Sequence, residues 1–457
     1  MASDRSTQLG EGSVLRLLAR FSGPAIVGMI AQAAYSVIDR IFVGRAIGTD
    51  GIAGIAVAFP FMLIMLAFGM LIGFGSAALI SIRLGQQRRA DAEHILGNAT
   101  VLLTLAAVVT TAVGLPLIDP ILRFFGASEQ VLPYARDYLQ IITMGSVFQT
   151  VGFGLNAVIR SEGNPRIAML SMLLSVVVNG ILAPVFIFWF GWGMRGAALA
   201  TVLAQAATAA WVLFYFVGGT SVLRFHTRYW RLDRAICRGI MAVGSPACVM
   251  QLAASLLWSV MNHELKAHGG DLAVAVMGVI YAVMMAVAMP IFGLNQGVQP
   301  IIGYNYGAQR FDRVKKTLET AILAATAWTV VGFTLTMLFP VQIVRLFCVE
   351  RQDTAALVTL GSHAMRICTI MLPIVGFQIV SASYFQAVGK PKEAMLLMLS
   401  RQLLILVPAV VILPYFFGLN GVWAAMPTAD LCSSLLTGFC LVLELRHLRN
   451  GRTLEIA

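Results

Sequence analysis

Charged side chains are scarce in this chain of 457 residues: Asp, Glu, Lys and Arg together make up only 12%, against about a quarter in a typical soluble domain. Hydrophobic residues make up 59%, and the mean hydropathy is +0.84. This composition excludes a soluble enzyme domain, whose surface would need many more charges. It is typical of an integral membrane protein, and the length accommodates about twelve spanning helices of roughly 20 apolar residues each.

Patterns that indicate enzymatic chemistry are also lacking. The first half of the chain has no cysteine, and the six cysteines of the second half show no CxxC or metal-ligand spacing. The glycine-rich run GFGSAA from Gly73 lacks the lysine and the preceding strand of a phosphate-binding loop. We therefore expect no enzyme, no metal and no cofactor, so that an ion gradient must supply the energy for any transport.

Twelve apolar segments are present, separated by charges and by Gly/Pro clusters. They lie near residues 16–42, 52–82, 93–118, 131–159, 165–191, 194–218, 237–265, 272–305, 315–346, 356–387, 393–416 and 419–446. Most of the 32 basic residues fall in loops and ends on one side of this arrangement. The positive-inside rule therefore predicts an all-α protein with both termini cytoplasmic. Topology thus explains the net charge of +11, and we expect no nucleic-acid partner.

The two halves of the chain look like a repeat. Several identical residues recur at nearly constant offsets, on the same side of the predicted topology: Gly75/Gly297, Gly85/Gly307, Gln87/Gln309, Arg88/Arg310, Gly163/Gly389 and Pro165/Pro391. Six helices per half give both halves the same orientation, which predicts a pseudo-twofold axis along the membrane normal. We expect two six-helix lobes, 1–218 and 237–457, joined by a cytoplasmic linker at 219–236. A repeat within one chain favours a carrier over a channel.

Several long motifs resemble the MATE (multidrug and toxic compound extrusion) family, in its bacterial multidrug-efflux branch. They include NAVIRSEGNPRIAML from Asn156, GLNQGVQPIIGYNYGAQ from Gly293 and GLNGVWAAMPTAD from Gly418. The resemblance implies two lobes arranged as a V in a bacterial inner membrane. It also implies export of small amphipathic, often cationic drugs in exchange for protons or sodium, with no obligate protein partner.

An acidic residue within the first apolar segment is the clearest candidate for coupling transport to an ion. Asp39 lies on one helix face with Gln32 and Tyr35, because these residues recur at i, i+3 and i+7. Ionisable residues at membrane depth are costly and mark functional sites. A carboxyl group in a low-dielectric medium also keeps its proton to higher pH than in water. The alternative is an interfacial carboxylate paired with Arg40 or Arg45.

The family resemblance adds further residues to this site. It implies a cation-coupling network of Asp39, Tyr35, Asn179 and Thr201. A second family aspartate, one helical turn after the asparagine, is replaced here by Ala183. Because sodium needs several hard oxygen ligands while a proton needs one carboxyl group, we expect protons to be the coupling ion and sodium to be less favoured.

Uncharged amides within apolar segments are candidates for lining a drug cavity, because such groups face the interior of a helix bundle. These are Gln32, Asn156, Gln251, Asn262, Gln299 and Gln378. Asn262 occupies the repeat position of Asp39. Arg401 and Asp430 are expected to form a buried pair that holds the second lobe together.

A flippase for lipid-linked saccharides, built on a related fold, is the alternative function. Its phosphate-bearing substrate would need several basic residues in the cavity. Here only Arg366 and Arg401 lie well inside apolar segments.

Overall fold

The computed structural model describes residues 8–347 and 354–449, and the secondary structure in these ranges is helical. The N-terminal half contains α2 (Val14–Ile47), α3 (Thr49–Gly85), α4 (Arg89–Gly114), α5 (Ile118–Phe124), α6 (Leu132–Met144), α7 (Ser146–Ser161), α8 (Pro165–Pro184), a π-helix (Val185–Trp189) and α9 (Gly193–Val217). A 3-10 turn (Thr227–Trp230) follows. The C-terminal half contains α10 (Arg234–Gly307), α11 (Phe311–Leu338), α12 (Pro340–Leu346), α13 (Thr354–Thr369), α14 (Leu372–Ala387), α15 (Pro391–Leu399), a π-helix (Ser400–Leu406), α16 (Val407–Phe417) and α17 (Leu419–Arg449).

Among the described residues, ten helices are long and apolar enough to cross a membrane, and the number is twelve if each of two bent pairs forms one span. The bent pairs are α6 with α7, at 55°, and α13 with α14, at 47°. They correspond to the predicted segments 131–159 and 356–387, which were expected as single helices. Two other predicted segments, 237–265 and 272–305, both lie in α10, where the chain turns at Gly270 with φ +65°. Glycine adopts this left-handed conformation without steric cost.

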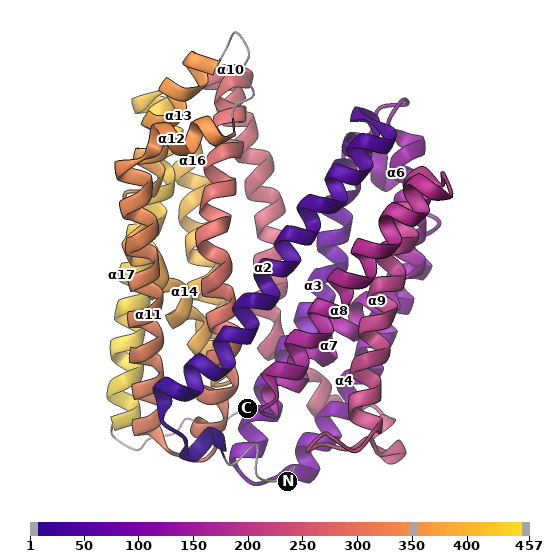
Figure 1. Cartoon of the computed structure of the whole chain (residues 1–457). Helices are drawn as coiled ribbons and strands as arrows, with labels where there is room; N and C mark the ends of the chain where they lie inside the picture. Colours follow the sequence, from indigo (N-terminus) through magenta and orange to yellow (C-terminus); the bar gives the residue numbers. More distant parts are fainter. Residues whose placement is uncertain (1–7, 348–353, 450–457) are drawn as a thin grey trace.

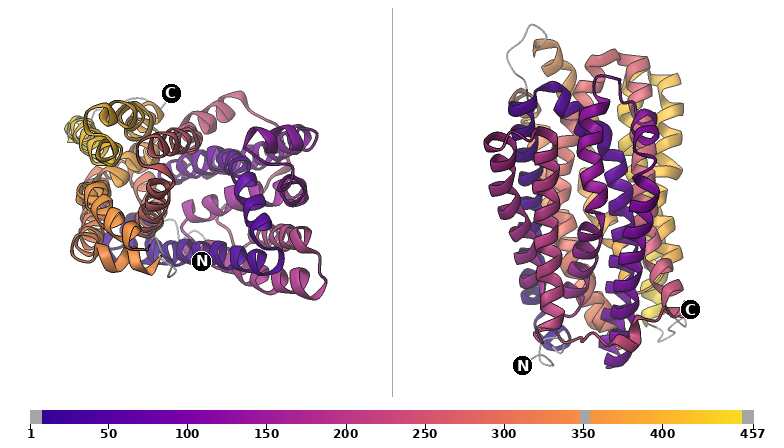
Figure 2. Two further views of the ribbon diagram at one scale, coloured as in Figure 1. Left: turned by 90° about the horizontal axis from the view of Figure 1, so that it is seen from above. Right: turned by 90° about the vertical axis from the view of Figure 1, so that its right-hand side faces the viewer.

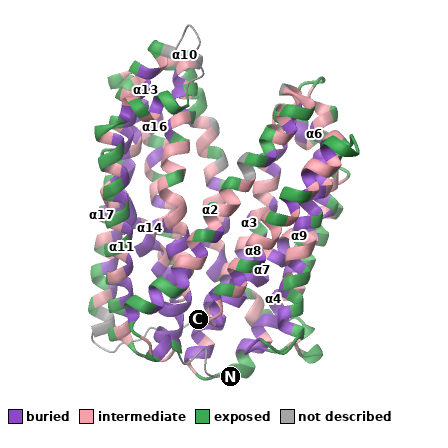
Figure 3. Cartoon of the chain, viewed as in Figure 1, coloured by how far each residue is buried: buried purple, intermediate pink, exposed green. Residues whose placement is uncertain are grey.

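The helices form two bundles that spread apart at one end and converge at the other, as a V (Figure 1). The start of α2 and the end of α17 both lie at the converging end. The view from above shows the two bundles side by side (Figure 2). Large apolar side chains are exposed on the outside, including Leu323 at 71% and Phe439 at 64%, and buried residues gather where the bundles meet (Figure 3). The all-α, two-bundle prediction is therefore confirmed.

Four glycines bring α3 and α10 into direct backbone contact at the converging end, and we call these residues the glycine seam. A Cβ added at Gly75, Gly85, Gly244 or Gly307 would lie 2.1, 2.0, 1.6 or 2.1 Å from a backbone oxygen of the facing helix. No side chain fits at such distances. The two lobes are thus closed against each other at this end.

The repeat is also visible in the backbone. Gln87 and Gln309 have φ values of +61° and +57°, and they are the two non-glycine residues with positive φ in the described chain. Each follows the last turn of a spanning helix and precedes the next one. The pairing of Gln87 with Gln309 predicted from the sequence therefore extends to an uncommon local conformation.

The chain before α2 crosses to the other lobe. Asn305 Nδ2 donates to the backbone oxygen of Leu9 at 2.9 Å, Arg310 to that of Gly10 at 2.6 Å, and Arg313 to that of Gly12 at 2.7 Å. The start of the first lobe is therefore anchored on the second lobe.

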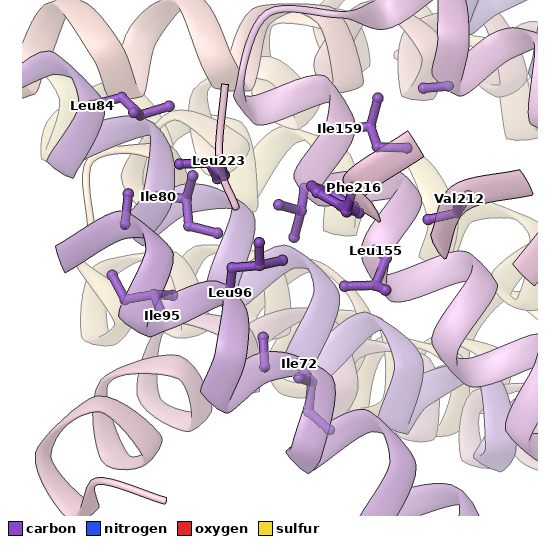
Figure 4. Packing of buried hydrophobic residues seen from close by; sticks show 14 of the residues in the cluster. Ile72, Ile80, Leu84, Ile95, Leu96, Leu155, Ile159, Val212, Phe216 and Leu223 are labelled. Atoms are coloured by element: carbon purple, nitrogen blue, oxygen red, sulfur yellow. The ribbon is translucent and has the colours of Figure 1, made fainter. Parts of the chain in front are cut away.

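The linker at 219–236 is anchored on the first lobe. Leu223 packs among Ile80, Leu96 and Phe216 (Figure 4). The Glu93 carboxylate accepts a hydrogen bond from the Arg224 backbone N–H at 3.2 Å. The linker is thus held against the lobe that precedes it, although it leads into α10.

Candidate cation-coupling site

The Asp39 side chain is buried within α2. Its exposure is 7%, and its Oδ1 has no hydrogen-bond partner. Within the described residues it forms no ion pair with Arg40 or Arg45, both of which are exposed. The Arg40 guanidinium lies 6.0 Å from the centre of the Phe59 ring instead. The structure therefore favours a buried, unpaired carboxyl group over the interfacial pairing.

Three further side chains predicted for this site meet one helical turn from Asp39. The Tyr35 hydroxyl lies 3.2 Å from Thr201 Oγ1, and Asn179 Nδ2 donates to the same oxygen at 3.2 Å. Thr201 donates its own proton to the Ala197 carbonyl at 3.1 Å. Because this donor is used, Thr201 accepts from both neighbours. Residues of α2, α8 and α9 are thus joined in one polar network, whose role in coupling remains a prediction.

Tyr138 is a member of this site that the sequence reasoning missed. It lies on α6, is buried, and interacts with Asp39, Tyr35 and Thr201. Its segment shows no polar periodicity that would have distinguished it from a packing residue. Only the approach of α6 to α9 places its hydroxyl beside the network.

Ala183 fills the position where the family resemblance implies a second acid. It is fully buried and packs in an apolar cluster that includes Val43, Ile187 and Ala197. Among the described residues the site therefore has one carboxyl group, Asp39, one helical turn from the network of Tyr35, Thr201 and Asn179.

The amides predicted to line a cavity occupy different environments. Asn156 is buried and its Nδ2 donates to the Ala168 carbonyl at 2.9 Å and to Ser171 Oγ at 2.7 Å, which ties α7 to α8. Gln378 is buried with its Oε1 unpartnered, and Gln299 has an unpartnered Nε2. Gln32 and Gln251 are partly buried, whereas Asn262 is exposed. Binding of substrate by these residues remains a prediction.

The second lobe contains an acidic residue within a spanning helix, Asp430, which forms an ion pair with Arg401. Arg401 Nε donates to Asp430 Oδ1 at 2.6 Å, and Asp430 is 2% exposed. The expected pair is thus present between the π-helix after α15 and α17. Arg366, the other basic residue predicted within a segment, is exposed on α13.

Comparison with known proteins gives a consistent result over the whole chain. The sequence model of the MatE family matches residues 24–185 and 246–411. Multidrug export protein MepA of Staphylococcus haemolyticus is 27% identical over 448 residues, which are 98% of this chain and 96% of that protein. MepA of Staphylococcus aureus strain NCTC 8325 / PS 47 is 26% identical, over 97% and 96% of the two chains.

Solved structures of transporters share this fold. The MATE multidrug transporter DinF-BH, solved as a complex, is 40% identical, with a TM-score of 0.88 over 95% of this chain and 97% of that chain. A MOP superfamily transporter from Pyrococcus furiosus has a TM-score of 0.92 and 25% identity, over 98% and 99% of the two chains. The chain therefore belongs to the MATE family and is a membrane transporter, not an enzyme.

Proposed function

We propose that this protein is a secondary active multidrug efflux transporter, which exports amphipathic, often cationic compounds in exchange for protons by alternating access. The relatives' names support the substrate class, since MepA is a multidrug export protein and DinF-BH is a MATE multidrug transporter. The V, open at one end and sealed by the glycine seam at the other, has the form expected of one of the two alternating states.

The observation that carries the proposal is the buried, unpaired carboxyl group of Asp39. It can bind a proton or a cation, and either would neutralise its charge. Sodium would require several hard oxygen ligands held together, and Ala183 supplies none where the resemblance implies a carboxylate. A proton needs only the carboxyl oxygen itself, which favours proton coupling.

The converging end of the V is proposed to face the cytoplasm of a bacterial cell, in the inner membrane. Arg83, Arg310 and Arg313 lie in or beside the turns at this end, as the positive-inside rule requires. Both termini would then be cytoplasmic, and the V would open outward.

Transport by inside-out membrane vesicles tests the coupling ion. With a proton gradient and no sodium, we expect accumulation of a cationic dye that collapses when an uncoupler is added. With a sodium gradient alone and the uncoupler present, we expect no accumulation above that of vesicles lacking the protein. Accumulation driven by sodium alone would overturn proton coupling and leave efflux itself intact.

A further inference from the structure

The linker and the first turns of α10 carry a cluster of arginines. Between positions 224 and 238 there are five arginines and one acid, Asp233, so that this stretch has a net charge of +4 with His226 neutral. The arginine side chains are exposed, and none of them forms an ion pair with a described residue. They are Arg224, Arg228, Arg231, Arg234 and Arg238. Such a surface attracts an anionic partner.

The acidic side chains around the linker are already engaged in fixing its backbone. Asp233 Oδ1 accepts from the backbone N–H groups of Ala235 and Ile236, at 2.7 and 3.3 Å. Glu93 pairs with Arg89 Nε at 3.1 Å, and it also accepts from the linker backbone. These carboxylates therefore hold the linker in place and do not neutralise its arginines.

Two large apolar side chains are exposed among the same arginines. Trp230 is 52% exposed and Leu232 is 45% exposed. The backbone that carries them is fixed on α4, because Asn98 Nδ2 donates to the carbonyl oxygens of Tyr229 and Arg231 at 3.2 and 3.4 Å. Tryptophan is enriched where headgroups meet hydrocarbon, since its ring is apolar and its N–H is polar. The combination of exposed tryptophan and arginine favours a membrane surface over a water-soluble partner.

The lengths of α4 and α9 place this segment at the level of lipid headgroups. α9 begins directly after Trp192, and its 25 residues rise by about 37 Å. That rise matches a hydrocarbon core of roughly 30 Å with part of one headgroup layer, and the linker starts at its end. Asn98 lies about 24 Å from the other end of α4, at Gly114. The carbonyl groups bonded to Asn98 are thus near the edge of the hydrocarbon, at the foot of the first lobe (Figure 1).

We propose that this surface of the linker binds the headgroups of anionic phospholipids, such as phosphatidylglycerol. Guanidinium groups match the oxygens of a phosphate. Trp230 and Leu232 insert beside the headgroups, and the flanking arginines reach the phosphates. Basic residues clustered directly beside a spanning helix bind anionic lipids in this way. The inference does not depend on the substrate or on the coupling ion.

Photocrosslinking of the purified full-length protein in phosphatidylcholine nanodiscs tests the surface. Two lipid probes carry the same diazirine on the acyl chain next to the glycerol, and they differ only in the headgroup, phosphatidylglycerol or phosphatidylcholine. We expect the phosphatidylglycerol probe to label peptic peptides covering residues 219–236 at least threefold more than the other probe does. Combining Arg228→Gln, Arg231→Gln and Arg234→Gln in one variant should bring this ratio close to one.

The matched control combines Lys315→Gln, Lys316→Gln and Lys392→Gln, which removes three exposed charges at the same end of the second lobe. It should leave the ratio unchanged. If the arginine triple variant is unstable, Arg231→Gln alone should lower the ratio, since the Arg231 side chain forms no ion pair within the described residues.

Equal labelling of the wild-type linker by both probes, or an unchanged ratio in the arginine variant, would overturn the proposal. Labelling by neither probe would also overturn it, because the linker would then lie away from lipid and its charge would serve a water-soluble partner. An equal loss of the ratio in the lysine variant would show that the net charge of this end of the molecule attracts the lipid, and not the linker.

Discussion

The Asp39 and Asp430 carboxyl groups are both buried within helices, but their surroundings differ. Asp430 Oδ1 accepts a hydrogen bond from Arg401 Nε at 2.6 Å, whereas Asp39 Oδ1 has no hydrogen-bond partner. The Arg401 guanidinium compensates the charge of Asp430, and no ion pair within the described residues does the same for Asp39. We therefore propose a coupling role for Asp39 and a structural role for Asp430.

Asp39→Asn is expected to abolish gradient-driven efflux, because the amide keeps the shape of the side chain and cannot release a proton. Expression and membrane insertion should remain close to wild type, since no ion pair is lost. Drug resistance conferred on an efflux-deficient host measures the effect. Asp312→Asn, an equal change of charge at an exposed position, is the control. Full resistance in the Asp39→Asn strain would show that another group carries the proton.

Glu162 is a titratable group that binds the linker. It lies in the turn after α7, and its Oε2 accepts from Ser221 Oγ at 2.6 Å and from the backbone N–H groups of Val222 and Leu223 at 3.2 and 3.4 Å. Burial raises the pKa of this carboxyl from 4.5 to about 7, and the hydrogen bonds from Ser221, Tyr215 and the two N–H groups oppose the rise.

The sign of the resulting pH dependence follows from the raised pKa. The folded protein holds the Glu162 proton more tightly than the unfolded chain does. Its stabilising contribution is therefore complete below pH 4.5 and is lost as the pH rises toward 7. We expect the stability of the wild type relative to Glu162→Gln to fall by roughly 3 kcal/mol over this range. Melting temperatures in detergent at pH 5 and pH 7.5 measure the change. A pH-independent difference would contradict the assignment.

At the scale of elements, the contact between α3 and α10 depends on the absence of side chains. The Gly244 Cα lies so close to α3 that an added Cβ would be 1.6 Å from the Leu71 carbonyl oxygen. Gly85 and Gly307, one of the pairs of the repeat, also lie against the backbone of the facing helix, so that an added Cβ at either would clash with a carbonyl oxygen. The sequence marks these glycines as a repeat, but the reason for them is that the backbones of two helices touch.

Gly244→Ala is expected to destabilise the closed converging end by about 1–3 kcal/mol, the usual cost of overpacking. A cysteine at Ser81, which is fully buried beside the seam, should then react faster with a soluble maleimide in inside-out vesicles. Gly278→Ala lies on the same helix with no heavy atom within 4 Å and is the matched control. Unchanged reactivity in a well-expressed Gly244→Ala protein would show that the seam tolerates the methyl group.

At the scale of the whole molecule, two segments outside the spanning helices are anchored on the lobes. Residues 8–13 are anchored on the second lobe, and the linker is anchored on the first. Rocking of the lobes must therefore either carry these contacts along or break them. Both anchors lie at the end that we assign to the cytoplasm.

The assigned orientation predicts which loops are accessible. In a cysteine-free background, a cysteine at Arg228 should be labelled by an impermeant maleimide in inside-out vesicles and not in whole cells. A cysteine at Glu129, which is exposed between α5 and α6, should show the reverse pattern. Labelling of position 228 from outside the cell would show that the assigned orientation is wrong.

The sequence alone determined the number of spans, the repeat and the missing acid at Ala183. These features are local: a bilayer requires long apolar helices whose backbone groups are satisfied internally, so spans can be counted from composition. Helix pairs that bend, such as α6 with α7, appear in the sequence as one apolar segment, because the bend does not interrupt the apolar run.

Only the tertiary structure decided which polar side chains meet. Tyr138 joined the Asp39 site and Asn156 was found tied to α8 because of how α6, α7, α8 and α9 pack. Arg160 looked like one more basic residue of a cytoplasmic loop, and it proved to be buried against α10 without a counter-ion. Burial and pairing depend on distances between residues far apart in the chain, and the packing of helices sets those distances.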